Sequence, residues 1–399
     1  MTRIEPLACA DPLGLPGLES ELQHRWLVWD AWTAGRRRVD LHPLVLGEAD
    51  HRAAIEKARA AWALVANAGE GDRARYRLAP DVERLAAAAR TGGDRRGVVR
   101  VDLLLRDDGT WAACEVNADC PGGYNESIAL PLLSRRAGAR HTLRDPTVIA
   151  GRVADWLVAH DGLVAFVYAT AYSEDLQVCA LLERLVRERG GRTVRLSPTQ
   201  LRAGADGGLA YRGERIAAMY RFYPLEYMAG QANLDAIVNA TAAGRIACLS
   251  SFGLIHAQSK LAMALAPPND VFPRTVELAE VPLEQLLAER ARWVLKRDLS
   301  RVGDHVFVGA LHDDAQWAEL VAEITAAVRD LGQVWIAQEF VAQRPLVSPW
   351  GTRLVTLGAY LLVDGASSEF AGYFARVSPT SHCSHDALVL PTFHLEEAS

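Results

Sequence analysis

Four polar residues with metal- and phosphate-binding chemistry recur at every second position in two neighbouring segments of the chain. Arg100 and Asp102 lie in the alternating run VRVDLLL, and Glu115 and Asn117 lie in the run WAACEVN. The intervening DDGT, residues 107–110, is typical of a tight turn, so the two runs predict a β-hairpin. Because residues two apart on a strand share a face, all four side chains are expected on one face.

This face would combine two carboxylates with one amide oxygen. Such hard oxygen ligands are the ones that Mg²⁺ prefers, and phosphate oxygens can complete its coordination. The candidate metal ligands are therefore Asp102, Glu115 and Asn117. A cross-strand ladder of salt bridges on a solvated face is the alternative interpretation of the same pattern.

Lysine is rare in this chain, because only three of its 43 basic residues are lysine: Lys57, Lys260 and Lys296. A lysine ammonium is a compact charge on a flexible stem, and it contacts phosphate oxygens in a way that a planar guanidinium does not. Lys296 lies in the apolar segment WVLK, where an unpaired charge is costly. We expect Lys260 and Lys296 to contact an anion, whereas Lys57 fits an exposed helix. Chance survival of three lysines in an arginine-rich chain is the alternative.

Composition excludes several classes of protein. A net charge of −6 gives no reason to expect nucleic acid or an anionic membrane as a partner. No run of about 18 apolar residues predicts a membrane span, and the first residues lack the apolar core of a secretion signal. The six cysteines are scattered without a CxxC pair, which argues against zinc sites and disulfides. The expected location is the cytoplasm.

The chain, with 399 residues, is long enough for several packed units. Helical spacing marks the segments 17–34, 49–69 and 81–91, so residues 1–95 are expected to be mainly helical. Residues 96–147 contain the hairpin, and residues 150–235 show the strand–helix–strand order of a small α/β unit. The remaining residues, 240–399, mix strands and helices.

Three further positions are candidates for substrate contact. Asn125 and Glu126 begin a predicted helix in GGYNES, where they would either cap the helix or line a substrate loop. Arg221 lies at the carboxyl end of a strand, the end at which α/β sheets deliver ligand-facing groups. A salt bridge at the rim is an equally good interpretation of Arg221.

Polar groups late in the chain also suggest a bound anion or base. The loop RDLSRVG after Lys296 can cradle phosphate with its backbone N–H groups, although a plain connecting loop is the simpler interpretation. Gln338 and Glu339 end a short strand and could face an adenine edge, or could be solvated residues of an edge strand. Arg376 in an aromatic-rich strand needs an anionic partner, which a structural salt bridge would also supply. The segment HCSH, residues 382–385, lacks the second cluster that a closed zinc site needs.

Taken in chain order, these segments resemble the circularly permuted ATP-grasp fold of the glutathionylspermidine synthetase family. That family carries an R-x-D strand, an E-x-N-A-D-x-P segment, a lysine on a helix, a K-x4-R-x-G loop, a Q-x-F/Y-V strand and a late arginine. The matching residues here are Arg100, Asp102, Glu115, Asn117, Ala118, Asp119, Pro121, Lys260, Lys296, Arg301, Gly303, Gln338, Phe340, Val341 and Arg376. The match covers the hairpin and most of residues 245–390.

The resemblance implies an α+β or α/β protein, with a circularly permuted ATP-grasp core, a small α/β substrate domain and a helical N-terminal region. It implies that ATP and two Mg²⁺ ions bind, with the metals held by Asp102, Glu115 and Asn117. It places the nucleotide against Lys260, Lys296, Arg301, Gly303, Gln338, Glu339, Phe340 and Val341. It also implies that Arg100 and Arg376 face the transferred phosphate.

The implied activity is an ATP-dependent ligase that joins a small carboxylate to an amine through an acyl phosphate, releasing ADP and phosphate. Its partners would be these small molecules, with no nucleic acid and no membrane. Residues 1–95 and 150–235 do not match the family, so the family's peptide and polyamine substrates are not carried over. The alternatives are an ATP-grasp phosphotransferase, which would leave a stable phosphorylated product, and a nucleotide-binding protein without turnover.

Overall fold

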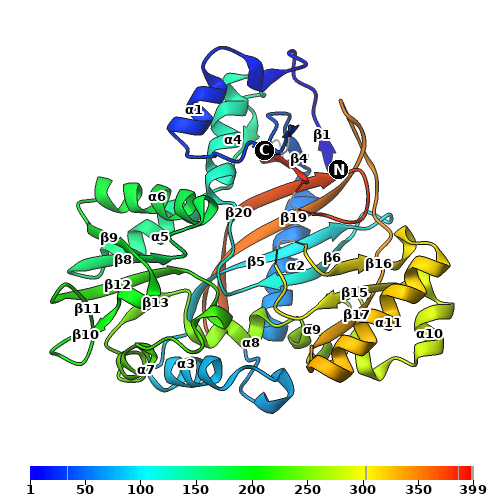
Figure 1. The fold of residues 1–399 in the computed structure, drawn as a ribbon. Helices are drawn as coiled ribbons and strands as arrows, with labels where there is room; N and C mark the ends of the chain where they lie inside the picture. The colour runs from blue at the N-terminus through cyan, green and yellow to red at the C-terminus, as the bar shows by residue number, and fades with distance from the viewer. Residues whose placement is uncertain (34, 302, 385, 397–399) are drawn as a thin grey trace.

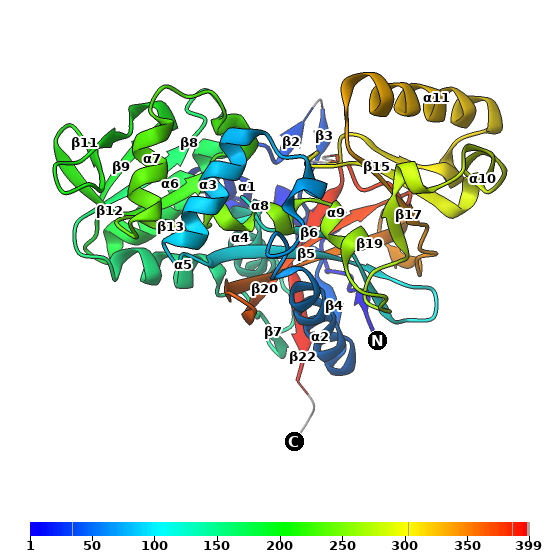
Figure 2. The same ribbon diagram turned by 90° about the horizontal axis from the view of Figure 1, so that it is seen from below.

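Three packed units lie in a row along the molecule. The computed structural model describes residues 1–33, 35–301, 303–384 and 386–396. A central antiparallel sheet is flanked by an α/β unit on one side and by a small antiparallel sheet with its helices on the other (Figure 1). The view from below shows the same arrangement (Figure 2). The mixed α/β class expected from the sequence is therefore confirmed.

The central sheet contains the predicted hairpin and confirms it. Arg100 lies opposite Asn117 and Asp102 lies opposite Glu115, so the four polar residues share one face. The strand order is β21-β20-β19-β5-β6, with β18 paired to β19. The strands are β5 (Arg96–Leu105), β6 (Trp111–Asn117), β18 (Leu346–Ser348), β19 (Gly351–Asp364), β20 (Ser367–Ser378) and β21 (Leu388–Leu390).

The opposite face of the central sheet is apolar and packs on one long helix. Val99, Val101 and Leu103 alternate with the polar residues of β5 and are buried. They form one core with the small and aromatic residues of helix α2 (Glu48–Val65), among them Trp62. Because this side is filled by α2, the polar face is the side on which a ligand can lie.

The α/β unit has a sheet of order β10-β11-β12-β8-β9, with β13 added to β12, and β8 runs parallel to both β9 and β12. Alternate residues of β8 face opposite helix layers: one layer is α3 with α7, and the other is α5 with α6. The strands are β8 (Leu163–Tyr168), β9 (Arg192–Leu196), β10 (Arg202–Ala203), β11 (Leu209–Tyr211), β12 (Glu214–Phe222) and β13 (Ala247–Leu249). The helices are α3 (Pro80–Thr91), α5 (Ile149–Val158), α6 (Ser173–Glu188) and α7 (Leu234–Ala242).

The third unit is the antiparallel sheet β14-β17-β15-β16. Its residues Trp293, Leu295 and Trp335 pack on helices α10 and α11. The other face carries Lys296 and Gln338, and it is turned toward strand β6 of the central sheet. The elements are β14 (Thr275–Glu277), α10 (Leu283–Ala288), β15 (Trp293–Arg297), β16 (Val306–Val308), α11 (Asp314–Leu331) and β17 (Trp335–Glu339).

The N-terminal region is less helical than its spacing predicts. The helix expected over 17–34 is only α1 (Leu18–His24), because Leu27 adopts a left-handed backbone with φ of 57° that an L-residue cannot continue as a helix. Short strands also form here: β2 and β3 pair as a hairpin, while β1 and β4 join β22 and β7, which come from later in the chain, in the sheet β1-β4-β22-β7. They are β1 (Arg3–Ile4), β2 (Trp32–Thr33), β3 (Arg36–Arg37), β4 (Leu44–Leu46), β7 (Leu143–Arg144) and β22 (Thr392–Leu395).

Three further helices lie between the sheets: the longer α4 (Tyr124–Arg136) and the short α8 (Ile255–Gln258) and α9 (Leu261–Leu265). Helix α4 follows the Pro-Gly-Gly turn after β6, and α8 and α9 lie between the α/β unit and the third unit (Figure 1). Among the described helices, none combines the length and the apolar character required to cross a membrane.

Candidate functional site

The centre of the polar face is a carboxylate held between two arginines. Arg100 donates through Nε to Asp102 Oδ1 at 2.7 Å, and Arg376 donates through Nη2 to Asp102 Oδ2 at 2.6 Å. Burial alone would raise the pKa of Asp102, which is only 4% exposed, but the two guanidinium groups lower that pKa to about 2. The Nε of Arg376 is buried and has no acceptor within the described residues. The cluster of Arg100, Asp102 and Arg376 therefore has one buried N–H, at Nε of Arg376, that no described residue accepts.

Two glycines make room for this arrangement. A Cβ on Gly358 would lie 2.6 Å from Arg100 Cδ, so only glycine lets the Arg100 side chain lie flat across β19. A Cβ on Gly123, whose φ is +97°, would lie 2.6 Å from the Phe374 ring, over which both arginines stack. A glycine inside a predicted strand is a known sign of close approach, and this signal at Gly358 could have been recognised in the sequence.

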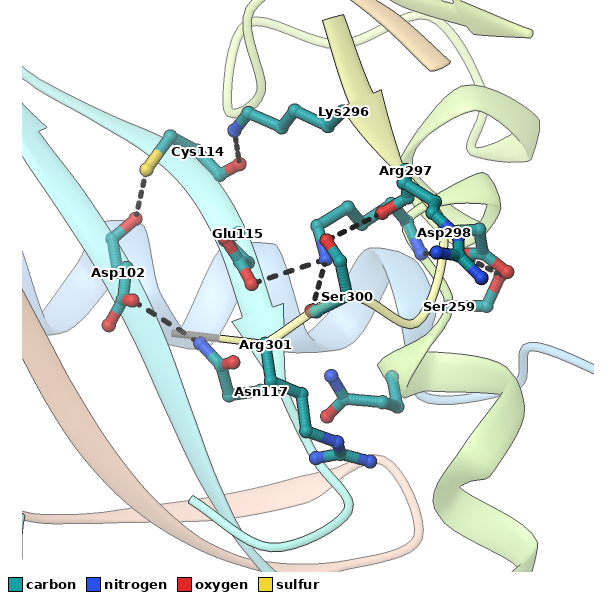
Figure 3. Close-up of polar contacts among 12 residues, drawn as sticks. Asp102, Cys114, Glu115, Asn117, Ser259, Lys296, Arg297, Asp298, Ser300 and Arg301 are labelled. Carbon is teal, nitrogen blue, oxygen red and sulfur yellow. Dashed lines mark hydrogen bonds and ion pairs between the residues drawn. The ribbon is translucent and has the colours of Figure 1, made fainter. Parts of the chain in front are cut away.

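Glu115 and Asn117 lie beside Asp102 at the edge of the sheet (Figure 3). Asn117 donates through Nδ2 to Asp102 Oδ2 at 3.3 Å, and Glu115 Oε1 is 3.4 Å from the ammonium of Lys260. Lys260 is only 2% exposed and also donates to Ser300 O at 3.0 Å. The structure thus brings together the three predicted metal ligands and one of the two predicted phosphate-binding lysines.

The resemblance predicts Lys260 on a helix, but in the structure it lies at the break between α8 and α9. A buried carboxylate, Asp298, holds this break: it accepts hydrogen bonds from the Lys260 backbone N at 2.6 Å and from Ser259 Oγ at 2.9 Å. Burial raises the pKa of Asp298, although the nearby Lys260 charge lowers it. Asp298 and Ser259 were missed by the sequence analysis, since the contact joins residues 39 positions apart.

Lys296 lies on the facing sheet and reaches across to β6 (Figure 3). Its ammonium donates to Cys114 O at 3.0 Å and to Gln338 Oε1 at 2.8 Å. Cys114 falls at an irregularity in the β5–β6 pairing, which leaves its carbonyl free to turn toward Lys296. Lys296 is 5% exposed, and no carboxylate of the described residues lies within ion-pair distance of it. A buried cation that is held only by neutral oxygens leaves its charge uncompensated.

The loop after Lys296 bends away from its own sheet toward the α/β unit. Arg301 donates to Asp119 Oδ2 at 2.8 Å and to Glu226 Oε1 at 3.0 Å, and Gly303 packs on the 382–384 segment. Asp119 is fully buried and also accepts from Arg221 Nη2 at 2.6 Å. Asp119 therefore joins the loop after β6, strand β12 and the Arg301 loop, a role that the sequence analysis did not assign to it.

The predicted adenine-binding segment divides into two parts. Gln338 faces the interior with Lys296 and donates to Thr275 Oγ1 at 3.0 Å. Glu339 pairs with Arg292 at 2.6 Å on the outer side of the sheet. Glu339, Phe340 and Val341 line a polar hollow of about 660 Å³ beside the β5–β6 turn. Gln338 therefore lies on one side of the end of β17, and the hollow lined by Glu339, Phe340 and Val341 lies on the other. The contacts of these four residues with adenine stay predictions.

Of the three candidate substrate residues, two are tied into the framework. Arg221 is 1% exposed and is engaged by Asp119, Tyr223 O and Ser250 O. Asn125 donates to Trp26 O and Gln177 O. Glu126 differs from both, because its buried carboxylate makes no hydrogen bond or ion pair with another described residue. Burial and the charge of Asp30 raise its pKa to about 7.

The raised pKa of Glu126 predicts a pH-dependent stability. The group has an ordinary pKa of 4.5 and a folded-state value of about 7, so its stabilising effect is complete below pH 4.5 and is lost as the pH rises through 7. Between these limits wild type should lose about 3 kcal/mol relative to Glu126→Gln. Urea unfolding at pH 5 and pH 8 measures this difference. The matched variant Glu188→Gln, at an exposed position of α6, should follow wild type; a Glu126→Gln curve that also follows wild type would contradict the prediction.

The described contacts of the HCSH segment do not form a metal site. His382 lies 3.4 Å from Gly303 O, and His385 is outside the described residues. Across the described ranges, no group of three or more His, Cys, Asp or Glu side chains is placed to hold a metal ion.

The polar face nevertheless has the oxygen ligands that Mg²⁺ prefers and the cationic N–H donors that bind phosphate. Glu115 and Asn117 supply hard oxygens at the sheet edge, while Asp102 would have to exchange a guanidinium contact for a metal. On the opposite side, Lys296 lacks a carboxylate partner, and Arg376 has a buried N–H without an acceptor. An anion between the two sheets would satisfy both.

The comparisons with known proteins concern the fold. No protein-family model matches the chain, and no curated protein matches it. Among solved structures, a glutathione synthetase-like effector from Globodera pallida in its apo form matches with a TM-score of 0.61 and 13% identity, covering 96% of this chain and 98% of that chain. A candidate γ-glutamylcysteine synthetase from Methylobacillus flagellatus matches at a TM-score of 0.38, 12% identity and 85% of both chains, too distant to indicate a shared fold.

The fold is therefore that of the glutathione synthetase-like effector, over nearly the full length of both chains. At 13% identity this likeness says nothing about substrate or activity. What this chain does has to be argued from its own polar face.

Proposed function

We propose that this protein is an ATP- and Mg²⁺-dependent ligase that joins a small carboxylate to an amine, and that its three units form a circularly permuted ATP-grasp fold. The observation that carries the proposal is a pair of cationic side chains on facing sheets that are only partly satisfied. Lys296 has no carboxylate partner among the described residues, and Arg376, which pairs with Asp102, has no acceptor for its buried Nε. Both lie near the oxygens of Glu115 and Asn117. A bound polyphosphate with Mg²⁺ has the charge and the ligands that this arrangement needs.

The chemistry follows from the charges. A carboxylate oxygen is a poor leaving group, so the carboxylate first attacks the terminal phosphorus of ATP and ADP departs, leaving an acyl phosphate. The amine nitrogen then attacks the acyl carbon, phosphate leaves, and the nitrogen loses a proton. Arg100 and Arg376 would stabilise the negative charge of the transferred phosphate and of the oxyanion. When bound, Mg²⁺ offsets the charge of the phosphate oxygens.

Nucleotide binding is tested first by thermal unfolding with ATP, with and without Mg²⁺. At about 100 times the dissociation constant, a ligand that binds only the folded state adds about 2.7 kcal/mol of stability. We expect a rise in Tm that requires Mg²⁺ and is lost in Glu115→Ala, because this carboxylate is a proposed metal ligand with 21% of its side chain exposed. Absence of the shift in wild type would reject the nucleotide site.

Turnover is tested by ADP release with a panel of carboxylic acids and amines. Release that needs both an acid and an amine, with an amide as product, would support the ligase. Release with a stable phosphorylated product and no amine requirement would favour a phosphotransferase. Binding of Mg-ATP without any release would favour a nucleotide-binding protein without turnover.

A further inference from the structure

The ammonium of Lys260 lies 3.4 Å from Glu115 Oε1, an oxygen of one of the proposed metal ligands. We propose that Lys260 closes the polar face to a divalent cation that arrives alone, and opens it when a polyphosphate takes over the ammonium. The inference rests on the proposed function for the identity of the polyphosphate. The closure itself is argued from contacts within the protein and is measured without nucleotide.

The first argument is that the ammonium and a metal ion compete for one carboxylate. The side chain of Lys260 is 1% exposed, whereas that of Glu115 is 21% exposed, so the carboxylate meets solvent and the ammonium lies behind it. Water screens a buried charge much less than an exposed one. A metal ion that approaches Glu115 from solvent therefore meets the nearly unscreened repulsion of the Lys260 charge.

The second argument is that the other candidate ligands are also engaged by donors of the protein. Asp102 accepts from Arg100 Nε at 2.7 Å through one oxygen and from Arg376 Nη2 at 2.6 Å through the other. Asn117 turns its Nδ2, and not its oxygen, toward Asp102 at 3.3 Å. No side chain of this set presents a carboxylate that is free of a cation, so a metal ion has to displace a protein donor before it can bind.

The charge of the polar face as a whole points the same way. Its cations are Arg100, Lys260, Lys296 and Arg376, and its carboxylates are Asp102 and Glu115. The cations are in excess, so a divalent cation alone adds to an uncompensated positive charge. A polyphosphate carries the opposite charge and can neutralise this excess before the metal is bound.

The structure makes the Lys260 ammonium the part of this face that can change partners. Asp298 accepts from the Lys260 backbone N at 2.6 Å, which fixes the main chain. Within the described ranges, the ammonium is held by Ser300 O at 3.0 Å and by the longer contact to Glu115. A flexible stem joins the two ends of the residue, so the ammonium can move to a phosphate oxygen while the backbone stays in place.

The contact with Ser300 connects the ammonium to the loop after Lys296. Ser300 lies in the segment RDLSRVG, whose backbone N–H groups are predicted to cradle phosphate. Glu115 on β6 and Ser300 on this loop lie near each other, and both contact the same ammonium (Figure 3). An anion held by this loop therefore lies close to Lys260. The metal and the polyphosphate should then strengthen each other's binding by the same factor.

The test is calorimetric titration of MnCl₂ into the full-length protein without nucleotide, because Mn²⁺ shares the preference of Mg²⁺ for oxygen ligands. We expect no saturable binding to wild type. Lys260→Met should bind Mn²⁺ saturably, at least about tenfold more tightly than the limit set by wild type, since the opposing charge is gone. Glu115→Ala added to Lys260→Met should abolish this binding. Lys57→Met removes a lysine that contacts Asp270 O instead, and should behave as wild type does.

A second variant, Lys260→Gln, covers the case that Lys260→Met does not fold, because its amide can still donate to Ser300 O. Saturable binding of Mn²⁺ to nucleotide-free wild type that Glu115→Ala removes would overturn the proposal. A folded Lys260 variant that binds Mn²⁺ no better than wild type would overturn it as well.

These outcomes are separate from those of the proposed function, since no ATP is present. Binding of Mn²⁺ to Lys260→Met, without any Mg-ATP shift in wild type, would reject the ligase and keep the closure of the metal site by Lys260. A Mg-ATP shift in wild type, together with binding of Mn²⁺ to the nucleotide-free protein, would keep the nucleotide site and reject the closure.

Discussion

Replacing Asp102 by asparagine is expected to lower the free energy of unfolding by about 3 to 5 kcal/mol, the range for breaking a buried ion pair from one side. The carboxylate is 4% exposed and accepts from both Arg100 and Arg376. Asparagine keeps the shape but leaves the buried guanidinium of Arg100 and the half-buried guanidinium of Arg376 near each other without a counter-charge. Chemical unfolding of both proteins at neutral pH measures the difference.

The matched control is Asp364→Asn. Asp364 pairs with Arg96 at 2.8 Å, but both side chains are more than half exposed, so its loss should change stability by less than about 1 kcal/mol. Acid provides an independent check on Asp102. With its pKa lowered to about 2 from 3.8, its stabilising effect is present above pH 3.8 and disappears as the pH falls through 2. Equal stability of the two variants at neutral pH would show that the arginines find other partners.

The hairpin was predictable because its information is local. Alternation over a few residues assigns each side chain of β5 and β6 to a face, and the DDGT turn sets the pairing. The same reasoning placed Lys296 and Gln338 each in a strand, whereas the pairing of those two strands in one sheet is known only from the structure. Such patterns show which residues share a face, but they do not show which other sheet that face will meet.

The contacts that complete the site join distant parts of the chain, and no local pattern announces them. Asp119 meets Arg221 and Arg301 across more than a hundred positions each, and Asp298 meets Ser259 across 39. In the sequence, Glu126 could be either a helix cap or a residue of a substrate loop, because Asp and Glu are common in a first turn. Its isolation depends on which side chains lie around it, which only the packed structure defines.

The remaining prediction concerns Lys296, whose replacement by methionine should remove ATP binding and spare the fold. Methionine has nearly the length of lysine and no charge, so it relieves a buried ammonium while leaving Cys114 O and Gln338 Oε1 without a donor. These effects oppose each other, and we expect a stability change within about 2 kcal/mol. Affinity for Mg-ATP should fall at least about 30-fold, since one partner of a buried charge pair is lost. Calorimetric titration measures the loss.

Two further lysine variants make that result specific. Lys57→Met removes the lysine of α2, whose ammonium lies 3.5 Å from Asp270 O and which lines the hollow beside Glu339, Phe340 and Val341. This variant separates that hollow from the face that carries Lys296, and we expect it to bind Mg-ATP normally. Lys296→Arg keeps the charge but brings a wider, planar group into a site that is 5% exposed, so it should restore little affinity. Recovery in Lys296→Arg would mean that charge alone matters there. Wild-type affinity in Lys296→Met would make Lys296 a structural link between β15 and β6, and the anion would then have to be held by Lys260 and the arginines.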